Sequence, residues 1–247
     1  MKISVVTSFY NGDLMIPFFL NHYSYADEIL ILFNDNEKTI DPSTEKLILS
    51  YRNARIESFM YPNNKADYAF AIDYCNRVIS KLDSDWAIVV SADELIFPIG
   101  MRDARRVLCD ADGVIINTWL WWVFRHITDK DLDPSLTPIW QRRHGYPDRT
   151  FCGCIKPVIV RPDAGITFSI GGHGCGASRG VASKIRFDGA HWLNADPVIA
   201  IQRRMRGRRE RVSERSLQDG MGSQHFDITK KAIRKECKEH LNDPKLF

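Results

Sequence analysis

The sequence lacks any apolar run long enough to cross a membrane. A spanning helix needs about 20 consecutive apolar residues, and no such stretch occurs in the 247 residues. The opening stretch MKISVVTSFYNGD also has too short an apolar run for a signal peptide, because Tyr10, Asn11 and Asp13 interrupt it at once. We therefore expect a protein that is not exported and that works in the cytoplasm, at most peripherally at a membrane.

Cysteine is sparse, and nothing in its spacing indicates a structural framework. A chain of this length buries about 70–75% of the surface that its unfolded form exposes, so the six cysteines are not needed as disulfides and we expect reduced thiols. The motifs CGC at 152–154 and HGC at 173–175 have one-residue gaps, whereas zinc ligands usually stand two to four residues apart. This spacing disfavours a zinc site.

Charge is close to balanced except in one segment. The net charge is only +3, but residues 203–215 hold seven arginines and two glutamates. Such a run can meet an anionic acceptor, a phospholipid surface or a nucleic acid. It can equally be a solvated helix face, because Glu210 and Glu214 can pair with arginines one turn away.

Strand-like and helix-like segments alternate through the first half of the chain. Short β-branched and apolar runs predict buried strands, and longer segments with helical spacing of apolar residues predict helices between them. This alternation favours a mostly parallel sheet with helices on both faces. The predicted strands are 2–10, 27–35, 55–64 and 85–90, and the predicted helices are 12–26, 43–53 (N-cap Ser43 or Thr44) and 65–82.

The second half is less regular, and the sequence shows no internal repeat, linker or domain boundary. Its clearest elements are strands at 112–126 and 154–162, a glycine-rich loop at 165–180, a helix from about Pro197, and an amphipathic helix at 226–241. We therefore expect one α/β domain with an elaborated second half.

Two adjacent carboxylates interrupt an apolar stretch at the end of the fourth predicted strand. Ligands of open α/β sheets bind beyond the carboxyl ends of the strands, and the four predicted ends, 7–11, 33–36, 61–65 and 91–94, are all polar. Burying Asp93 and Glu94 there is costly unless something compensates. A hard cation such as Mg²⁺ or Mn²⁺, which also neutralises a diphosphate, is one answer. The alternative is that Asp93 caps a turn and Glu94 is exposed.

The stretch DWAIVVSADELIFP at 85–98 resembles the acidic-motif segment of nucleotide-sugar glycosyltransferases with the GT-A fold. It is most similar to the branch of glycosyltransferase family 2 in which this motif reads Asp-Ala-Asp-Glu. The first strand, helix and second strand resemble that branch as well. IKPVIVRP, GGHG and GAHWLNADPVIAIQRRMRG resemble its Lys strand, its Gly-x-His loop and its histidine-plus-basic-helix segment, in the same order, so that the likeness covers roughly residues 2–210.

The resemblance implies a GT-A-like, Rossmann-like architecture: a mostly parallel central sheet with helices on both faces and a less regular C-terminal half. We expect a single domain over 1–247. Within it, 1–125 would bind the nucleotide sugar, 126–212 would complete the acceptor and metal site, and 213–247 would form a helical tail.

The resemblance also assigns roles to individual residues. Asp93 matches the motif aspartate that binds the metal bridging the phosphates, and His191 matches a histidine close to the phosphates or the metal. Ser91 stands where the family has its first Asp, although a serine can still hold a metal-bound water or a ribose hydroxyl. The residues expected at the donor are Thr7, Asp35, Lys65, Ser91, Lys156 and His173.

Family 2 resemblance implies inversion by direct displacement. A base removes the proton of the acceptor hydroxyl, while Mn²⁺ or Mg²⁺ and basic side chains stabilise the leaving nucleoside diphosphate. The candidate bases are Asp148 and Glu94. We expect a UDP-sugar donor and an acceptor that is a glycan, a lipid-linked saccharide or a modified nucleic acid.

Some of these residues have an ordinary packing interpretation. A lone histidine such as His191 is often a buried, hydrogen-bonded side chain, whereas His173 lies among glycines, where backbone can approach a ligand closely. Trp119, Trp121 and Trp122 can stack on sugar rings near the acceptor, but strand alternation points at least one of them inward.

Three other functions compete with glycosyl transfer. A sugar-nucleotide-forming nucleotidyltransferase would need a glycine-rich, Arg-containing loop after the first strand, and TSFYNGDLMIP has one glycine and no basic residue. A non-catalytic nucleotide-sugar-binding module or scaffold is favoured by Ser91 alone. A nucleic-acid-binding protein would use the arginines of 203–215 and bind with a steep salt dependence.

Overall fold

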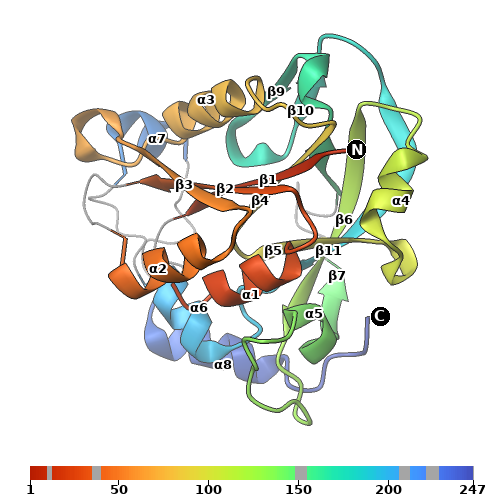
Figure 1. Ribbon diagram of the computed structural model, residues 1–247. Helices are drawn as coiled ribbons and strands as arrows, with labels where there is room; N and C mark the ends of the chain where they lie inside the picture. The colour runs from red at the N-terminus through yellow and green to blue at the C-terminus, as the bar shows by residue number, and fades with distance from the viewer. Residues whose placement is uncertain (10–12, 35–39, 148–154, 206–211, 221–227, 247) are drawn as a thin grey trace.

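The computed structural model describes residues 1–9, 13–34, 40–147, 155–205, 212–220 and 228–246. One large sheet runs through the molecule, with the strand order β3-β2-β1-β4-β8-β6-β11-β5 and with β7 paired to β6 (Figure 1). Its strands are β1 (Ile3–Phe9), β2 (Glu28–Asn34), β3 (Ala54–Phe59), β4 (Trp86–Ser91), β5 (Glu94–Pro98), β6 (Ile115–Phe124), β7 (His144–Pro147), β8 (Ile155–Val160) and β11 (Ala182–His191).

The first half of the chain forms the regular part of this sheet. β1 lies between β2 and β4, β3 lies outside β2, and all three pairings are parallel. Residues of β1 alternate between the two faces: Ile3 and Val5 pack in the main core, whereas Val6 packs in a second cluster on the other face. This burial on both faces explains why the strands read as continuous apolar runs.

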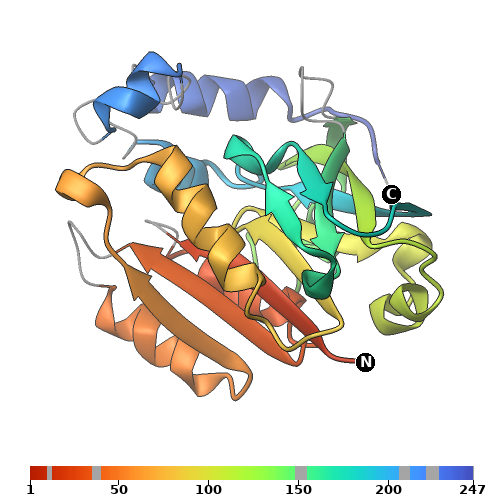
Figure 2. The same cartoon turned by 90° about the horizontal axis from the view of Figure 1, so that it is seen from above.

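Helices cover both faces of the parallel strands, as predicted. In Figure 1, α1 and α2 lie on one side of β1–β4 and α3 lies on the other. Figure 2 shows α3 beside the small hairpin of β9 (Ile166–Phe168) and β10 (Cys175–Ala177). The helices are α1 (Ile16–His22), α2 (Pro42–Ser50), α3 (Tyr68–Ile79), α4 (Ala104–Cys109), α5 (Pro138–Gln141), α6 (Pro197–Arg204), α7 (Glu214–Gln218) and α8 (Lys230–Glu239).

The start of α2 differs from the prediction. Asp41, not Ser43 or Thr44, is the N-cap, and its carboxylate accepts from the backbone N–H groups of both residues. Pro42 occupies the first turn of the helix, where its missing N–H has no partner to lose. The sequence therefore holds a stronger cap just upstream of the predicted one.

The second half adds a mixed section to the same sheet. β8 is antiparallel to both β4 and β6, β11 is parallel to β6, and β5 is antiparallel to β11. The predicted α/β class with helices on both faces is confirmed, and the antiparallel pairings lie in this less regular half. Four short strands, β5, β7, β9 and β10, and the ten-residue strand β11 were not predicted.

The cysteines of the described residues are free thiols, as expected: Cys75, Cys109, Cys175 and Cys237. Burial raises the pKa of Cys75 to about 12, which suppresses its reactivity. The predicted CGC motif at 152–154 lies outside the described residues.

Candidate active site

The acidic motif forms the turn between β4 and β5. β4 ends at Ser91, β5 begins at Glu94, and Ala92 and Asp93 connect them. The turn lies beyond the carboxyl end of β4, and the neighbouring β1 ends at the same level, since Ser8 is the register partner of Ser91. Asp93 and Glu94 are 6% and 3% exposed, so the alternative of an exposed Glu94 is wrong.

Asp93 is compensated by His191, the last residue of β11. The Oδ2 atom of Asp93 lies 3.0 Å from Nε2 of His191. Burial opposes ionisation of Asp93, but the charge and the hydrogen bond of His191 outweigh it and hold the pKa of the carboxyl well below its usual range. Burial likewise disfavours charge on His191, but Asp93 raises the pKa of the imidazole. Each group thus stabilises the charged form of the other.

Glu94 is compensated by Lys156 of β8. The lysine Nζ lies 2.5 Å from Oε1 of Glu94, and the other carboxylate oxygen accepts from the backbone N–H of Ser91 at 3.0 Å. The hydroxyl of Tyr23, from α1, donates to the Glu94 carbonyl at 3.0 Å and accepts from the N–H of Ile96 at 2.9 Å. These bonds join β4, β5, β8 and α1 and fix the turn that carries Asp93.

The His191 ring is held from its other side by Trp122. These residues are register partners on β11 and β6, and their ring centroids lie 3.9 Å apart at an interplanar angle of 31°. The Nδ1 atom of His191 is buried and has no hydrogen-bond partner among the residues that the structure describes. A buried imidazole nitrogen without a partner is unusual in a purely structural histidine, so the ring has bonding capacity left for a ligand or a water.

A further cation reaches this group from α6. The positive charge of Arg203 helps to lower the pKa of Asp93. Burial raises the pKa of Tyr68, at the start of α3, and the charge of Arg203 opposes that rise. Asp196 caps α6 by accepting from the N–H groups of Val198 and Ile199, and Arg203 lies in the last turn of this helix. Among the arginines of the predicted 203–215 segment, Arg203 therefore has an electrostatic role beside Asp93.

The structure brings together five of the predicted site residues: Ser91, Asp93, Glu94, Lys156 and His191. Thr7 is buried in β1, beside Val90 of β4. Lys65 is exposed after the turn at Pro62–Asn64, and His173 is exposed in the hairpin connection that packs on the α3 side of the sheet. Asp35 and Asp148 lie outside the described residues.

Sequence reasoning missed Tyr23, the specific role of Arg203, and the contact of Trp122 with His191, although it named Trp122 as a residue that can stack on a sugar. Tyr23 reads as one more apolar position of a helix, and Trp122 meets His191 only because β6 and β11 pair. A short-range sequence signal existed only for Arg203, since it begins the basic segment.

The residues present fit a divalent cation that is shared with a phosphate. Among the described residues, no group of three or more His, Cys, Asp or Glu side chains could hold a metal. The Oδ2 atom of Asp93 and the Nε2 atom of His191 lie 3.0 Å apart, so a cation bound by both atoms would take the place of the proton that they share. Mg²⁺ and similar ions commonly use one or two carboxylates together with waters and substrate phosphates, so a pair of ligands suffices for such an ion.

The helices of the described residues include none with the length and apolar character that a membrane span requires.

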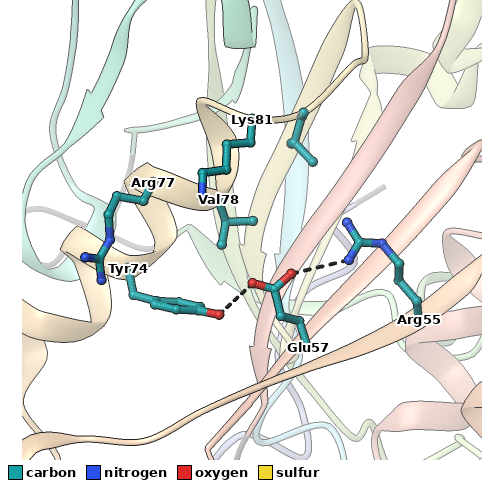
Figure 3. A pocket seen from close by; sticks show the side chains of 7 residues that line it. Arg55, Glu57, Tyr74, Arg77, Val78 and Lys81 are labelled. Atoms are coloured by element: carbon teal, nitrogen blue, oxygen red, sulfur yellow. Dashed lines mark hydrogen bonds and ion pairs between the residues drawn. The ribbon is translucent and has the colours of Figure 1, made fainter.

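A pocket elsewhere on the molecule is lined by residues of β3 and α3 (Figure 3). Glu57 accepts from the hydroxyl of Tyr74 at 2.5 Å and from the guanidinium of Arg55 at 3.3 Å. Arg77 lies 5.6 Å from the centre of the Tyr74 ring. β3 is the edge strand of the sheet, with β2 and β1 between it and β4, so this edge pocket is separate from the acidic turn.

No family model matches the chain, and no curated protein matches it. Solved structures with a similar arrangement include Staphylococcus aureus TarS 1–349 in complex with UDP-GlcNAc, at 14% identity and TM-score 0.41, covering 98% of this chain and 72% of that one. Another is Mycobacterium tuberculosis glucosyl-3-phosphoglycerate synthase with Mn²⁺, UDP and phosphoglyceric acid, at 16% identity and TM-score 0.32, covering 49% of this chain and 43% of that one.

A third is Yersinia pseudotuberculosis HddC, at 12% identity and TM-score 0.38, covering 82% of this chain and 97% of that one. All three TM-scores are below 0.5, so these likenesses carry no weight for the function, which is inferred from the site itself.

Proposed function

We propose that this protein transfers a sugar from a nucleotide-sugar donor to the hydroxyl of an acceptor. One observation carries the proposal: a buried Asp93–His191 pair, with Arg203 near it, lies beyond the carboxyl ends of adjacent parallel strands. This is where open α/β sheets bind nucleotides. The charges are of the kinds that a nucleoside diphosphate needs, a carboxylate for a metal ion and cations for the phosphates.

Asp93 and His191 would hold Mn²⁺ or Mg²⁺, which supplies positive charge to a departing diphosphate. The guanidinium of Arg203 would supply further positive charge that does not depend on the metal. The aromatic ring of Trp122 fixes the imidazole, so that little reorganisation is needed when negative charge develops nearby. We propose UDP as the nucleotide of the donor.

The surrounding predictions stay part of this proposal. Ser91, at the end of β4, would hold a ribose hydroxyl or a metal-bound water. The other proposed donor contacts are Thr7, Asp35, Lys65, Lys156 and His173. Lys156 already neutralises Glu94, so a phosphate would have to share it with that carboxylate.

The acceptor is proposed to attack with inversion of the anomeric carbon, its proton taken by a carboxylate. Glu94 is bound to Lys156 and to the N–H of Ser91, so both of its carboxylate oxygens are engaged, and these bonds favour a positioning role. This leaves Asp148 as the preferred base, with Glu94 second. A glycan, a lipid-linked saccharide or a modified nucleic acid would supply the hydroxyl, in the cytoplasm or at its membrane surface.

The proposal is tested by screening UDP-, GDP-, dTDP- and CMP-sugars for thermal stabilisation and for slow hydrolysis of the donor, with and without Mn²⁺. The variant Asp93→Ala should lose both effects. Asp93→Asn keeps the size and the hydrogen-bonding capacity of the side chain and separates loss of charge from loss of folding. If no donor binds, or if both variants bind and turn over like the parent, the proposal fails.

The competing functions predict different results in the same screen. A nucleotidyltransferase would release pyrophosphate from a nucleoside triphosphate and a sugar phosphate. A non-catalytic module would bind a donor without hydrolysing it. A nucleic-acid-binding protein would ignore all donors and bind DNA with a steep dependence on salt.

A further inference from the structure

An aromatic surface continues outward from His191 across two strands. Trp122 of β6 is the register partner of His191 on one side and of Tyr146 in β7 on the other. Residues directly opposite each other on paired strands project from the same face of the sheet. His191, Trp122 and Tyr146 therefore form a row on one face; Trp122 and Tyr146 are called the aromatic row below.

The aromatic row is held rigidly. The Tyr146 ring stacks on Phe124 at 5.7 Å and lies 5.1 Å from the ring of His240, which itself stacks on Phe124 at 3.9 Å. A Cβ atom added at Gly145 would lie 1.8 Å from the carbonyl oxygen of Trp122. Only a glycine at this position therefore allows β7 to approach β6 so closely. Tyr146 nevertheless remains 37% exposed.

Two of the arginines that flank the aromatic row in the chain are already engaged, and a third, Arg143, lies over the ring of Trp140, 4.9 Å from its centre. Arg125, just after β6, pairs with Asp131 at 3.0 Å. Arg142, just before β7, is 1% exposed, donates to the carbonyl of Ala195 at 2.9 Å and lies 3.9 Å from Asp129. A polyanion such as a nucleic acid gains little from cations that are paired or buried, and the polar histidines beside the row do not suit a lipid surface.

The geometry points to the aromatic row as the subsite of a saccharide acceptor, with a pyranose ring packed against Trp122 and Tyr146. The apolar C–H face of a sugar ring matches a flat aromatic surface, and the tyrosine hydroxyl can exchange hydrogen bonds with sugar hydroxyls. Because Trp122 also touches His191, a sugar on this row presents a hydroxyl next to the proposed transfer centre. The inference rests on the proposed function and selects a saccharide among its possible acceptors.

Saturation-transfer NMR tests the inference directly. The probes are the methyl pyranosides of glucose, galactose, mannose and N-acetylglucosamine, added with UDP and Mn²⁺. We expect at least one to bind, with the strongest signals on the C–H protons of one ring face. Tyr146→Ala should weaken its affinity at least tenfold, whereas Tyr146→Phe should keep most of it because the ring remains.

Trp119→Ala is the matched control. Trp119 lies on the same strand, is 41% exposed and projects from the opposite face, since it is an odd number of residues from Trp122. Its loss should leave saccharide binding unchanged. The inference is overturned if no pyranoside binds, if Tyr146→Ala binds like the parent, or if Trp119→Ala loses as much. Binding of DNA or anionic vesicles that Tyr146→Ala abolishes would overturn it as well.

Binding of the nucleotide to the same variants separates this inference from the proposed function. Tyr146→Ala should bind UDP as tightly as the parent. If UDP binds to all variants and the pyranosides bind to none, the saccharide subsite fails while the proposed function stands. If UDP binds to no variant and not to the parent, the proposed function fails first.

Discussion

Two of the molecule's groups of paired charges lie in different surroundings. At the acidic turn, the side chains of Glu94 and Lys156 are 4% and 10% exposed. In the edge pocket, the paired side chains of Glu57 and Arg55 are 35% and 50% exposed. The carboxylates of both groups are hydrogen-bonded, but only the first group carries a large desolvation penalty.

This difference shows where function is to be sought. An exposed ion pair is an ordinary surface feature worth about 0–1 kcal/mol. A buried pair is often no more stable than apolar side chains of the same size, so stability alone does not account for one. The acidic turn has one such pair, Glu94–Lys156, beside a second pair in which Asp93 is buried and the side chain of His191 is 18% exposed, which favours a chemical role for that region over the edge pocket.

The largest expected effect comes from breaking the buried pair on one side. Lys156→Met leaves Glu94 charged and buried, and it should lower the free energy of unfolding by about 3–5 kcal/mol. Urea denaturation measures it. The double variant Lys156→Met/Glu94→Leu should regain much of the loss, because no charge is then stranded. An equally unstable double variant would show that the pair itself, rather than the unpaired charge, sets the cost.

The next effect separates the two regions by activity. With the donor identified by the screen, Asp93→Asn should lower turnover by at least about 100-fold, since it removes charge from the transfer centre. Glu57→Gln, in the edge pocket, should leave turnover unchanged. Circular dichroism checks that both variants fold. Equal losses in the two variants would remove the distinction between the regions.

A smaller effect concerns the stability of the fold at low pH, through a histidine that contacts β5, the strand after the acidic turn. His22 of α1 bonds the carbonyl of Ile96 in β5 at 2.9 Å, and burial lowers its pKa to about 4. Between pH 6.5 and 4 the unfolded chain takes up a proton that the folded chain refuses, so stability falls as the pH falls through this window. From pH 7 to 5 the loss should be about 1–2 kcal/mol by urea denaturation. The variant His22→Gln should lack this loss of stability between pH 7 and 5. A pH profile of stability identical to that of the parent would contradict the assignment.

The smallest effect belongs to the edge pocket. Arg55→Met removes the cation that pairs with Glu57 and Glu28, and all three side chains are partly exposed. The free energy of unfolding should fall by at most about 1 kcal/mol. The pair is screened by solvent, so 0.5 M NaCl should reduce the difference further. A loss as large as that of Lys156→Met would mean that burial does not distinguish the two groups.

The sequence predicts the parallel half of the sheet and the position of its ends because local pattern decides both. Continuous apolar runs such as that of β4 need burial on two faces, and Asp93 follows such a run directly. Trp122 and Tyr146 are different: their position beside His191 depends on the pairing of β6 with β7 and β11, which are distant in the chain. Long-range register of this kind leaves no local signal. β5 was missed for a different reason: its four apolar residues form a short run without the alternation that would indicate a strand.

The central claim, that Asp93 and His191 form a metal-assisted nucleotide site, is tested most directly by calorimetric titration of the protein with UDP in the presence and absence of Mn²⁺. The account predicts binding that Mn²⁺ strengthens, a loss of the Mn²⁺ effect in Asp93→Asn and His191→Gln, and parent-like binding in Glu57→Gln. Equal binding of UDP and Mn²⁺ by the parent and by Asp93→Asn would contradict it.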